Sequence, residues 1–184
     1  MDRALEILMS RRSVRKYLEK QIPEESLQKI LAAGMRAATA MNRQSWHFTV
    51  VQDKVLLDDI SEAVGAVLSA SGVPSLHERA QEAAFHTFHR APTVVFVSAE
   101  ESTYSLADCA NASQNMCLAA TALHLGSCYI GSFVQAFKGE KGEQLRNRFS
   151  LPHGYHPVFA VALGYTDGPL PELTSRESKV SYIR

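Results

Sequence analysis

Residues 93–99, TVVFVSA, form a continuous apolar run bounded by Pro92 on one side and by Glu100 and Glu101 on the other. β-Branched and aromatic residues without alternating polar positions are typical of a strand that is buried on both faces. We therefore expect this strand at the centre of a sheet. The run is far too short to span a bilayer, so no membrane association is expected.

Two other segments have the composition of strands, WHFTVV at 46–51 and PVFAVALGY at 157–165. Between them lies a long stretch with little charge and many small residues, ADCANASQNMCLAATALHL, at 107–125. We expect a helix from about Leu106 to Leu125 with Gly126 at its C-cap. A helix with so few charges has to be covered on most sides by the sheet, by a partner subunit or by both.

Capping residues mark the starts of further helices. They are Asp2, Pro23, Asp53 and the pair Ser75 and Glu78, which has the spacing of a capping box. The first helix is expected to end near RRSVRKY (11–17), and the helix after Ser75 to run towards Arg90. Residues 1–184 then form one domain of mixed α and β structure, with roughly four strands and five or more helices.

The charge balance excludes one class of partner. Nineteen Lys and Arg residues equal nineteen Asp and Glu residues, so no net field draws a polyanion, and we expect no binding of nucleic acid. The first residues, MDRALEILMSRRSVRK, contain no apolar core of signal-peptide length. We expect a cytoplasmic protein.

No metal site is expected from the sequence. Cys109, Cys117 and Cys128 show neither a CxxC pair nor a zinc-ligand spacing. Cys109 and Cys117 are expected to pack as small apolar groups in the helix. His86 and His89 are three residues apart but have no carboxylate at ligand spacing beside them.

A cluster of basic residues follows the first expected helix: Arg11, Arg12, Ser13 and Arg15. Cations at a helix C-terminus complement its partial negative charge, which is one interpretation. The other is a phosphate clamp, because guanidinium groups and a hydroxyl can hold a phosphate with charge-assisted hydrogen bonds. The chain has neither a GxGxxG fingerprint nor a GxxxxGK[ST] loop, so a Rossmann or P-loop nucleotide site is not supported.

Three other segments are ordinary when taken singly. NRQ at 42–44 could present amide groups to a ring edge or simply connect a helix to a strand. In YIGS at 129–132, Gly131 would let the backbone approach a planar ligand. Arg176 and Lys179 are basic residues of a tail that could equally be solvated.

Taken in order, these segments resemble the FMN-dependent nitroreductase family. The resemblance rests on RRSVRKY, on NRQSWHF, on the spacing D-x-A-x-A-x-Q-N-M-x-L-A-A that begins at Asp108, on YIGSF, and on ALGY followed by a basic tail. It runs from about Leu5 to Arg176. It implies an α+β fold in which a mixed, mainly antiparallel sheet is flanked by helices, and an intertwined homodimer with FMN at the subunit interface.

The resemblance also implies roles for particular residues. The phosphate and ribityl end of non-covalent FMN would be held by Arg11, Arg12, Ser13 and Arg15, with Arg176 reaching the phosphate from the tail. The flavin ring would be contacted by Ala40, Met41, Asn42 and Gln44, in part from the other subunit, and by the backbone of Ile130 and Gly131. No side chain is assigned to catalysis, because the flavin itself carries the hydride.

The expected activity is hydride transfer from NADH or NADPH to a small electrophilic acceptor, such as a nitroaromatic or a quinone, by a ping-pong mechanism. Sister chemistries on the same fold remain alternatives: dehalogenation, enone reduction and flavin breakdown. A non-catalytic flavin-binding protein is another alternative. A phosphoprotein- or nucleic-acid-binding module that uses the arginine cluster is a third, which the zero net charge opposes.

Overall fold

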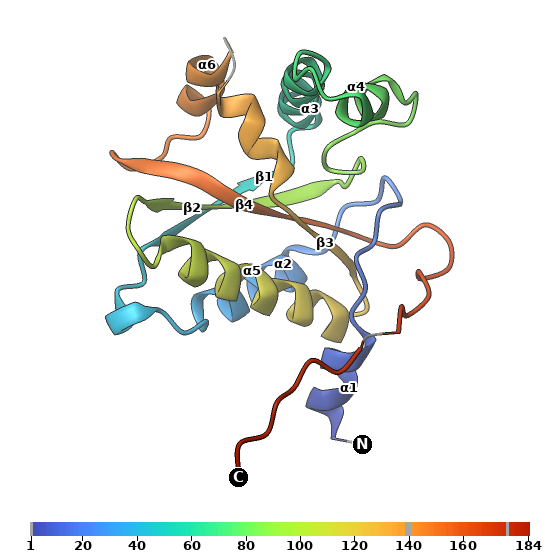
Figure 1. Cartoon of the computed structure of the whole chain (residues 1–184), viewed down its shortest axis with the longest axis vertical. Coiled ribbons are helices and arrows are strands. Elements are labelled where there is room, and N and C mark those ends of the chain that lie inside the picture. The colour runs from blue at the N-terminus through green and yellow to red at the C-terminus, as the bar shows by residue number, and fades with distance from the viewer. Residues whose placement is uncertain (1, 139–140, 176) are drawn as a thin grey trace.

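The centre of the molecule is a four-stranded sheet with the order β1-β2-β4-β3 (Figure 1). The computed structural model describes residues 2–138, 141–175 and 177–184. All three strand pairs are antiparallel. The strands are β1 (Trp46–Val51), β2 (Thr93–Glu100), β3 (Gly126–Ile130) and β4 (Tyr155–Gly164). The prediction that residues 93–99 form a buried central strand is confirmed, because β2 pairs on both edges and is buried from Thr93 to Ala99.

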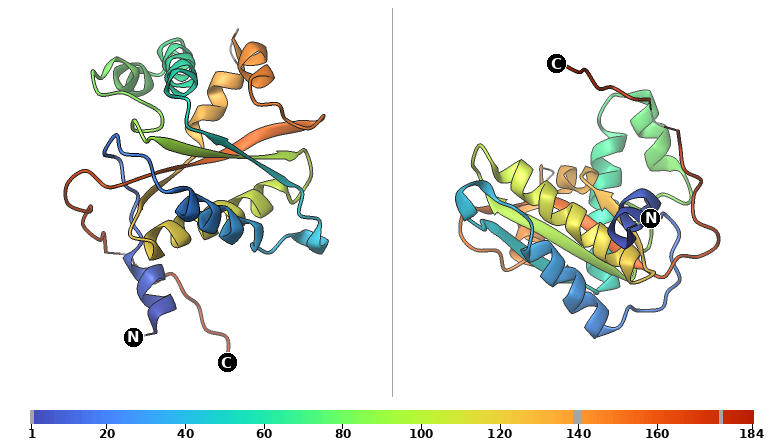
Figure 2. Two further views of the ribbon diagram at one scale, coloured as in Figure 1. Left: turned by 180° about the vertical axis from the view of Figure 1, so that it is seen from behind. Right: turned by 90° about the horizontal axis from the view of Figure 1, so that it is seen from below.

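Helices cover both faces of the sheet, as Figures 1 and 2 show. One face carries α2 (Glu24–Met35) and α5 (Ser105–Ala122). The other carries α3 (Lys54–Ser69), α4 (Pro74–Gln81), the 3-10 helix η2 (Ser132–Lys138) and α6 (Gly142–Asn147). Helix α1 (Arg3–Ser10) stands outside these layers, close to the C-terminal tail.

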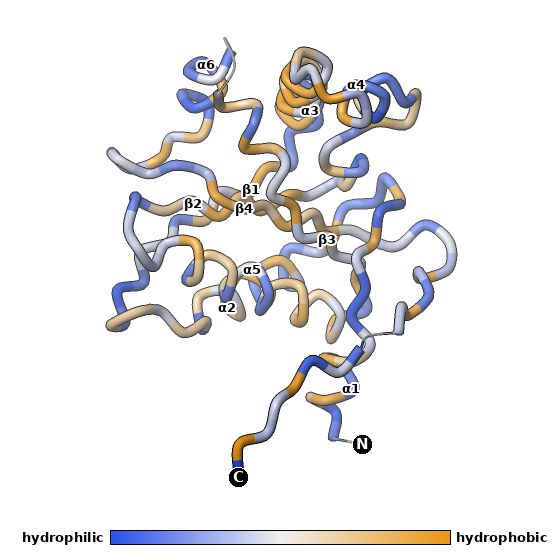
Figure 3. The backbone as a smooth tube through the Cα atoms, in the orientation of Figure 1, coloured by the Kyte–Doolittle hydropathy of each residue, from blue (hydrophilic) through white to orange (hydrophobic). Residues whose placement is uncertain are grey.

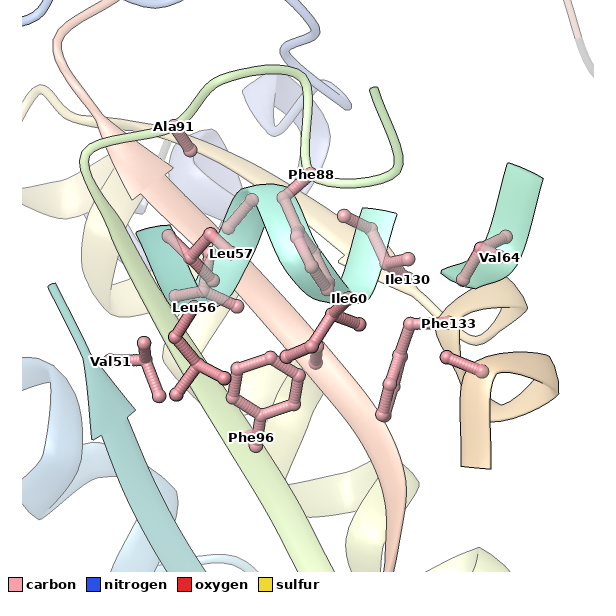
Figure 4. Packing of buried hydrophobic residues seen from close by; sticks show 14 of the residues in the cluster. Val51, Leu56, Leu57, Ile60, Val64, Phe88, Ala91, Phe96, Ile130 and Phe133 are labelled. Carbon is pink, nitrogen blue, oxygen red and sulfur yellow. The ribbon is translucent and has the colours of Figure 1, made fainter. Parts of the chain in front are cut away.

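Each face of the sheet has its own core because side chains alternate along β2. Phe96 points into the core under α3, where its ring meets Phe88 and Phe133 edge-on at centroid distances of 5.4 and 5.1 Å (Figure 4). Val95 and Val97 point the other way, into a core that contains Met116 of α5. Apolar colour concentrates on the strands and on α3 in Figure 3. Within the described residues, no helix combines the length and apolarity that crossing a membrane requires.

The predicted helix starts at Asp2, Pro23 and Asp53 are confirmed. The Asp2 carboxylate accepts a hydrogen bond from the amide of Ala4, and that of Asp53 from two amides of the first turn of α3. Helix α2 begins directly after Pro23.

The capping box at Ser75 and Glu78 is wrong. Helix α4 begins at Pro74 with Val73 as its N-cap and no side-chain cap. Proline has the φ of a first helical residue already fixed, so the helix starts before Ser75 and includes it. The helix also ends at Gln81, well short of Arg90.

Gly126 does not cap α5, which is a second correction. The helix ends at Ala122, and the left-handed residue after it is His124, with φ 58°. The amide of Leu125 donates to the carbonyl oxygen of Ala120 at 2.8 Å and closes the last turn in a Schellman arrangement. Gly126 is the first residue of β3 instead.

Candidate active site

The arginine cluster lies on an extended segment that runs beside β3. The amide of Val14 donates to the carbonyl oxygen of Ser127 at 2.9 Å, and Ser13 forms a parallel bridge with Ser127. The buried Tyr17 hydroxyl donates to the carbonyl oxygen of Val14 at 2.8 Å. Since Val14 and Tyr17 are buried and Arg15 is exposed, the segment is anchored through its apolar positions and presents its charge outward.

Arg11 and Arg15 both act electrostatically on β3. Burial raises the pKa of the Cys128 thiol, and the charges of Arg15 and Arg11 oppose that rise. Both guanidinium groups therefore lie close enough to this edge strand for their charges to act on it. Among the described residues, neither forms an ion pair with a carboxylate, so positive charge at this edge is left uncompensated.

Arg12 has a different environment. Its guanidinium donates to the carbonyl oxygens of Met9 and Ser10 at the end of α1, and to that of Pro171 at 3.1 Å. These are the contacts expected from a cation at a helix C-terminus, the alternative interpretation of the cluster. In this conformation Arg12 also holds Pro171 beside α1.

Ile130 and Gly131 stand at the far end of β3 from Ser127. Ile130 is buried and Gly131 is exposed. A Cβ atom added to Gly131 would make ordinary contact with the Phe159 ring at 3.7 Å, so the ring covers that side and the exposed surface of Gly131 is its backbone. At about 3.3 Å per residue, Gly131 lies about 13 Å from Ser127. One strand thus joins the basic segment to an accessible piece of backbone.

The segment with Ala40, Met41, Asn42 and Gln44 is firmly held by α5. The Ala40 amide donates to the buried carboxylate of Asp108 at 3.0 Å. Two amide side chains of α5 add hydrogen bonds to backbone carbonyl oxygens, from Asn111 to Ala38 and from Asn115 to Ala33. Left-handed φ values of 54°, 52° and 50° at Met41, Asn42 and Gln44 turn this exposed segment sharply.

The structure does not bring this segment, η1 (Ala40–Asn42), to the arginine cluster within one chain. The two lie at opposite ends of α5, as Figure 1 and the left view of Figure 2 show. Asp108 holds η1, whereas Thr121 shares a cavity with Arg12. At 1.5 Å per residue, these two positions on α5 are about 20 Å apart.

The last predicted residue, Arg176, lies outside the described residues. Lys179 is exposed. The chain before them passes close to the basic segment, since the Asp167 amide donates to the carbonyl oxygen of Lys16 at 3.0 Å.

Sequence reasoning missed His89. It lies in the loop between α4 and β2, near enough to Arg15 for that charge to act on it: burial first, and then Arg15, lowers the pKa of His89 to about 4. The loop and the basic segment also line one cavity of about 420 Å³, with Tyr17 and Gln21 on one side and His86 and Arg90 on the other. No local pattern signals this contact, because it joins distant parts of the chain. Within the described part of the chain, no three His, Cys, Asp or Glu side chains gather as a metal site would require.

Comparison with known proteins decides the family. The profile of the nitroreductase family matches residues 8–165. This chain belongs to the nitroreductase family. The expected α+β fold of that family is confirmed: a nitroreductase from Bacteroides fragilis, solved with bound FMN, superposes over 100% of both chains with a TM-score of 0.92 and 33% identity.

Other nitroreductases agree. A nitroreductase from Desulfitobacterium hafniense, also solved with bound FMN, covers 100% of both chains with a TM-score of 0.93 and 28% identity. A relative from Methanothermobacter thermautotrophicus, provisionally named NADH dehydrogenase/NAD(P)H nitroreductase, is 32% identical over 168 residues, which are 88% of this chain and 76% of the relative.

Proposed function

We propose that this nitroreductase binds FMN non-covalently and transfers hydride from NADH or NADPH to a small electrophilic acceptor, such as a nitroaromatic or a quinone. One observation carries the proposal: a segment with uncompensated cations is hydrogen-bonded to the same edge strand that leads into the exposed backbone of Gly131. A ligand with a phosphate dianion at the basic segment and a planar ring at the Gly131 backbone fits this arrangement. The FMN-bound nitroreductases of the same fold support it.

The residues of the basic segment fit the phosphate. Arg11 and Arg15 provide charge without a carboxylate partner among the described residues, and Ser13 provides a hydroxyl beside them. We assign Arg12 two roles, as a phosphate ligand and as a cap of α1, because its guanidinium holds the end of α1 in this conformation. We propose Arg176 as a further phosphate ligand, contributed by the tail.

The chain's own residues position and tune the cofactor. Bound FMN supplies the hydride chemistry. The Gly131 backbone can donate a hydrogen bond to the ring, and Arg15 places positive charge where it favours negative charge on a ligand. No nucleophile or acid–base pair is needed, so none is assigned.

We infer that the active unit is a homodimer. The segment 40–44 lies at the opposite end of α5 from the basic segment of its own chain. Its residues can therefore complete a flavin site only in a second copy. Leu106 of α5 and Met41 are large apolar side chains left 65% and 71% exposed in one chain. A partner subunit would cover both.

We further infer a ping-pong mechanism, in which the nicotinamide leaves before the acceptor enters, because two planar ligands cannot occupy the same hydride-transfer position.

Two experiments test the cofactor and the mechanism. Heat or acid should release a yellow chromophore with the mass of FMN. Initial rates at several acceptor concentrations should give parallel double-reciprocal lines. Release of FAD, or a colourless protein that FMN does not reconstitute, would contradict cofactor binding. Converging lines would contradict the ping-pong mechanism.

A further inference from the structure

The imidazole of His86 is fixed in one tautomer by its surroundings. Its side chain is only 6% exposed. Nδ1 lies 3.1 Å from the amide nitrogen of Phe88 and 3.2 Å from that of Arg90. Backbone amides can only donate, so Nδ1 is an unprotonated acceptor. Nε2 therefore carries the proton, and it donates to the Asp58 carboxylate at 3.1 Å.

The ring of His86 holds a loop that is otherwise unfavourable. His89 and Arg90 both have φ 55°, in the left-handed region that residues with a Cβ atom rarely adopt. Both amides bound by Nδ1 belong to this loop. The hydroxyl of Ser61 on α3 adds one more anchor by accepting from the Thr87 amide at 2.9 Å.

Loop 86–90 faces the basic segment. His86 and Arg90 of the loop line one cavity together with Tyr17 and Gln21, and the charge of Arg15 acts on His89. Just beyond the loop, the side-chain amide of Gln21 donates to the carbonyl oxygen of Pro92 at 2.6 Å and joins the two segments. A change in this loop therefore changes the environment of Arg15, the residue assigned to the cofactor.

We propose that His86 is a positioning residue for the flavin site: its neutral ring holds loop 86–90 beside the segment that carries Arg15, and protonation of Nδ1 breaks both amide contacts and releases the loop. A protonated Nδ1 would be a donor facing two donors. The inference rests on the proposed FMN site, because Arg15 is the link to the ligand.

The charges around the ring set the pH at which this occurs. Asp58 of α3 favours the protonated ring, whereas Arg90 of the loop and Lys54 of α3 oppose it. The neighbouring His89 stays uncharged until the pH falls towards 4, because its own pKa is about 4. The Phe88 ring packs against the imidazole edge-on. Burial is the largest influence and lowers the pKa of His86 below its usual 6.5. The loop is thus held at neutral pH and released in acid.

Two substitutions of His86 separate its two nitrogens. His86→Asn keeps an acceptor oxygen near the position of Nδ1 but cannot titrate. His86→Gln reaches towards Asp58 but removes the acceptor for the loop. At pH 7.5, His86→Asn should bind FMN within about threefold of the wild type, and His86→Gln about tenfold more weakly, the effect of losing one or two hydrogen bonds.

The pH profile distinguishes positioning from simple packing. The phosphate of FMN itself titrates near pH 6, so His86→Asn provides the baseline. As the pH falls from 7.5 through the range in which His86 takes up a proton, the wild type should lose about tenfold more affinity than His86→Asn. Asp58→Asn, which removes the charge that favours protonation, should move the extra loss to lower pH. Superimposable profiles for wild type and His86→Asn, or wild-type affinity in His86→Gln at pH 7.5, would overturn the proposal.

Amide hydrogen exchange at Phe88 and Arg90 keeps this test separate from the proposed function. In the wild type, the protection of both amides, relative to the exchange of an unprotected amide at the same pH, should fall in acid. In His86→Asn this protection should not change with pH. If no form of the protein binds FMN, the proposed function fails and the positioning role fails with it. The exchange rates then still decide whether His86 holds the loop, and equal relative protection in both proteins would show that it does not.

Discussion

The amide of Val14 is hydrogen-bonded to the carbonyl oxygen of Ser127 over 2.9 Å, which ties the basic segment to the edge strand β3. This contact gives Arg15 and the Gly131 backbone a fixed separation, set by the rise of one strand. The site described above depends on that separation, because a ligand must contact both ends.

Gly126 makes this attachment possible. A Cβ atom there would lie 2.9 Å from Thr166 Oγ1 and 3.0 Å from Val14 Cγ1. Gly126→Ala should push the basic segment off β3 and lower the free energy of unfolding by roughly 1–3 kcal/mol, the usual effect of overpacking. Urea unfolding and FMN titration measure the two effects. Gly65→Ala on α3, where the added Cβ would lie 3.4 Å from the nearest atom of the Phe85 ring, is the matched control and should be neutral or stabilising. Equal behaviour of the two variants would argue against the attachment.

Arg15 should contribute directly to FMN affinity. Arg15→Ala should weaken binding by about 1.5–3 kcal/mol, the range for a hydrogen bond to a charged group. Lys20→Ala is the control, because Lys20 lies on the same segment but packs over the Tyr165 ring at 4.7 Å. Fluorescence titration of FMN measures both. Unchanged affinity in Arg15→Ala would remove this residue from the site.

The homodimer can be tested with two equally exposed apolar residues. Leu106 on α5 and Val55 on α3 are each 65% exposed. Leu106→Lys should yield monomers without FMN, because a charge cannot be buried without a partner. Val55→Lys should sediment like the wild type, at about twice the 20.3 kDa of one chain. A wild-type protein that is monomeric and loaded with FMN would contradict the assembly.

His89 predicts a loss of stability in acid. Its pKa is about 4 in the folded chain, against a usual value of 6.5, so the unfolded chain binds the proton more readily. The stability that the neutral ring provides is complete above pH 6.5 and is lost as the pH falls towards 4. His89→Asn should therefore show a flatter pH dependence of urea unfolding than the wild type over this window. An anion bound beside Arg15 should also raise the pKa of His89, so an NMR titration without such a shift on FMN addition would place the ligand elsewhere.

Local chemistry made much of the fold predictable. The apolar residues of β2 and the caps Asp2 and Asp53 act on their immediate neighbours, so their effects are visible in short segments of sequence. The errors at Ser75 and Gly126 are also local, since the helix end lies one or two residues earlier in each case, at Pro74 and at His124.

The candidate site was predictable only in part. The basic segment and the Gly131 backbone are continuous stretches whose composition indicates ligand contacts. His89 reaches Arg15, and Arg12 reaches Pro171, only through the tertiary fold. No periodicity or spacing encodes such contacts, because they depend on how β2, β3 and the tail pack together.

Anaerobic mixing of the FMN-loaded protein with NADH or NADPH, without an acceptor, tests the central claim most directly. The yellow colour should bleach with at least one nicotinamide and return when a nitroaromatic or a quinone is added. A protein that is fully loaded with FMN and keeps its colour with both nicotinamides would contradict the proposed hydride transfer.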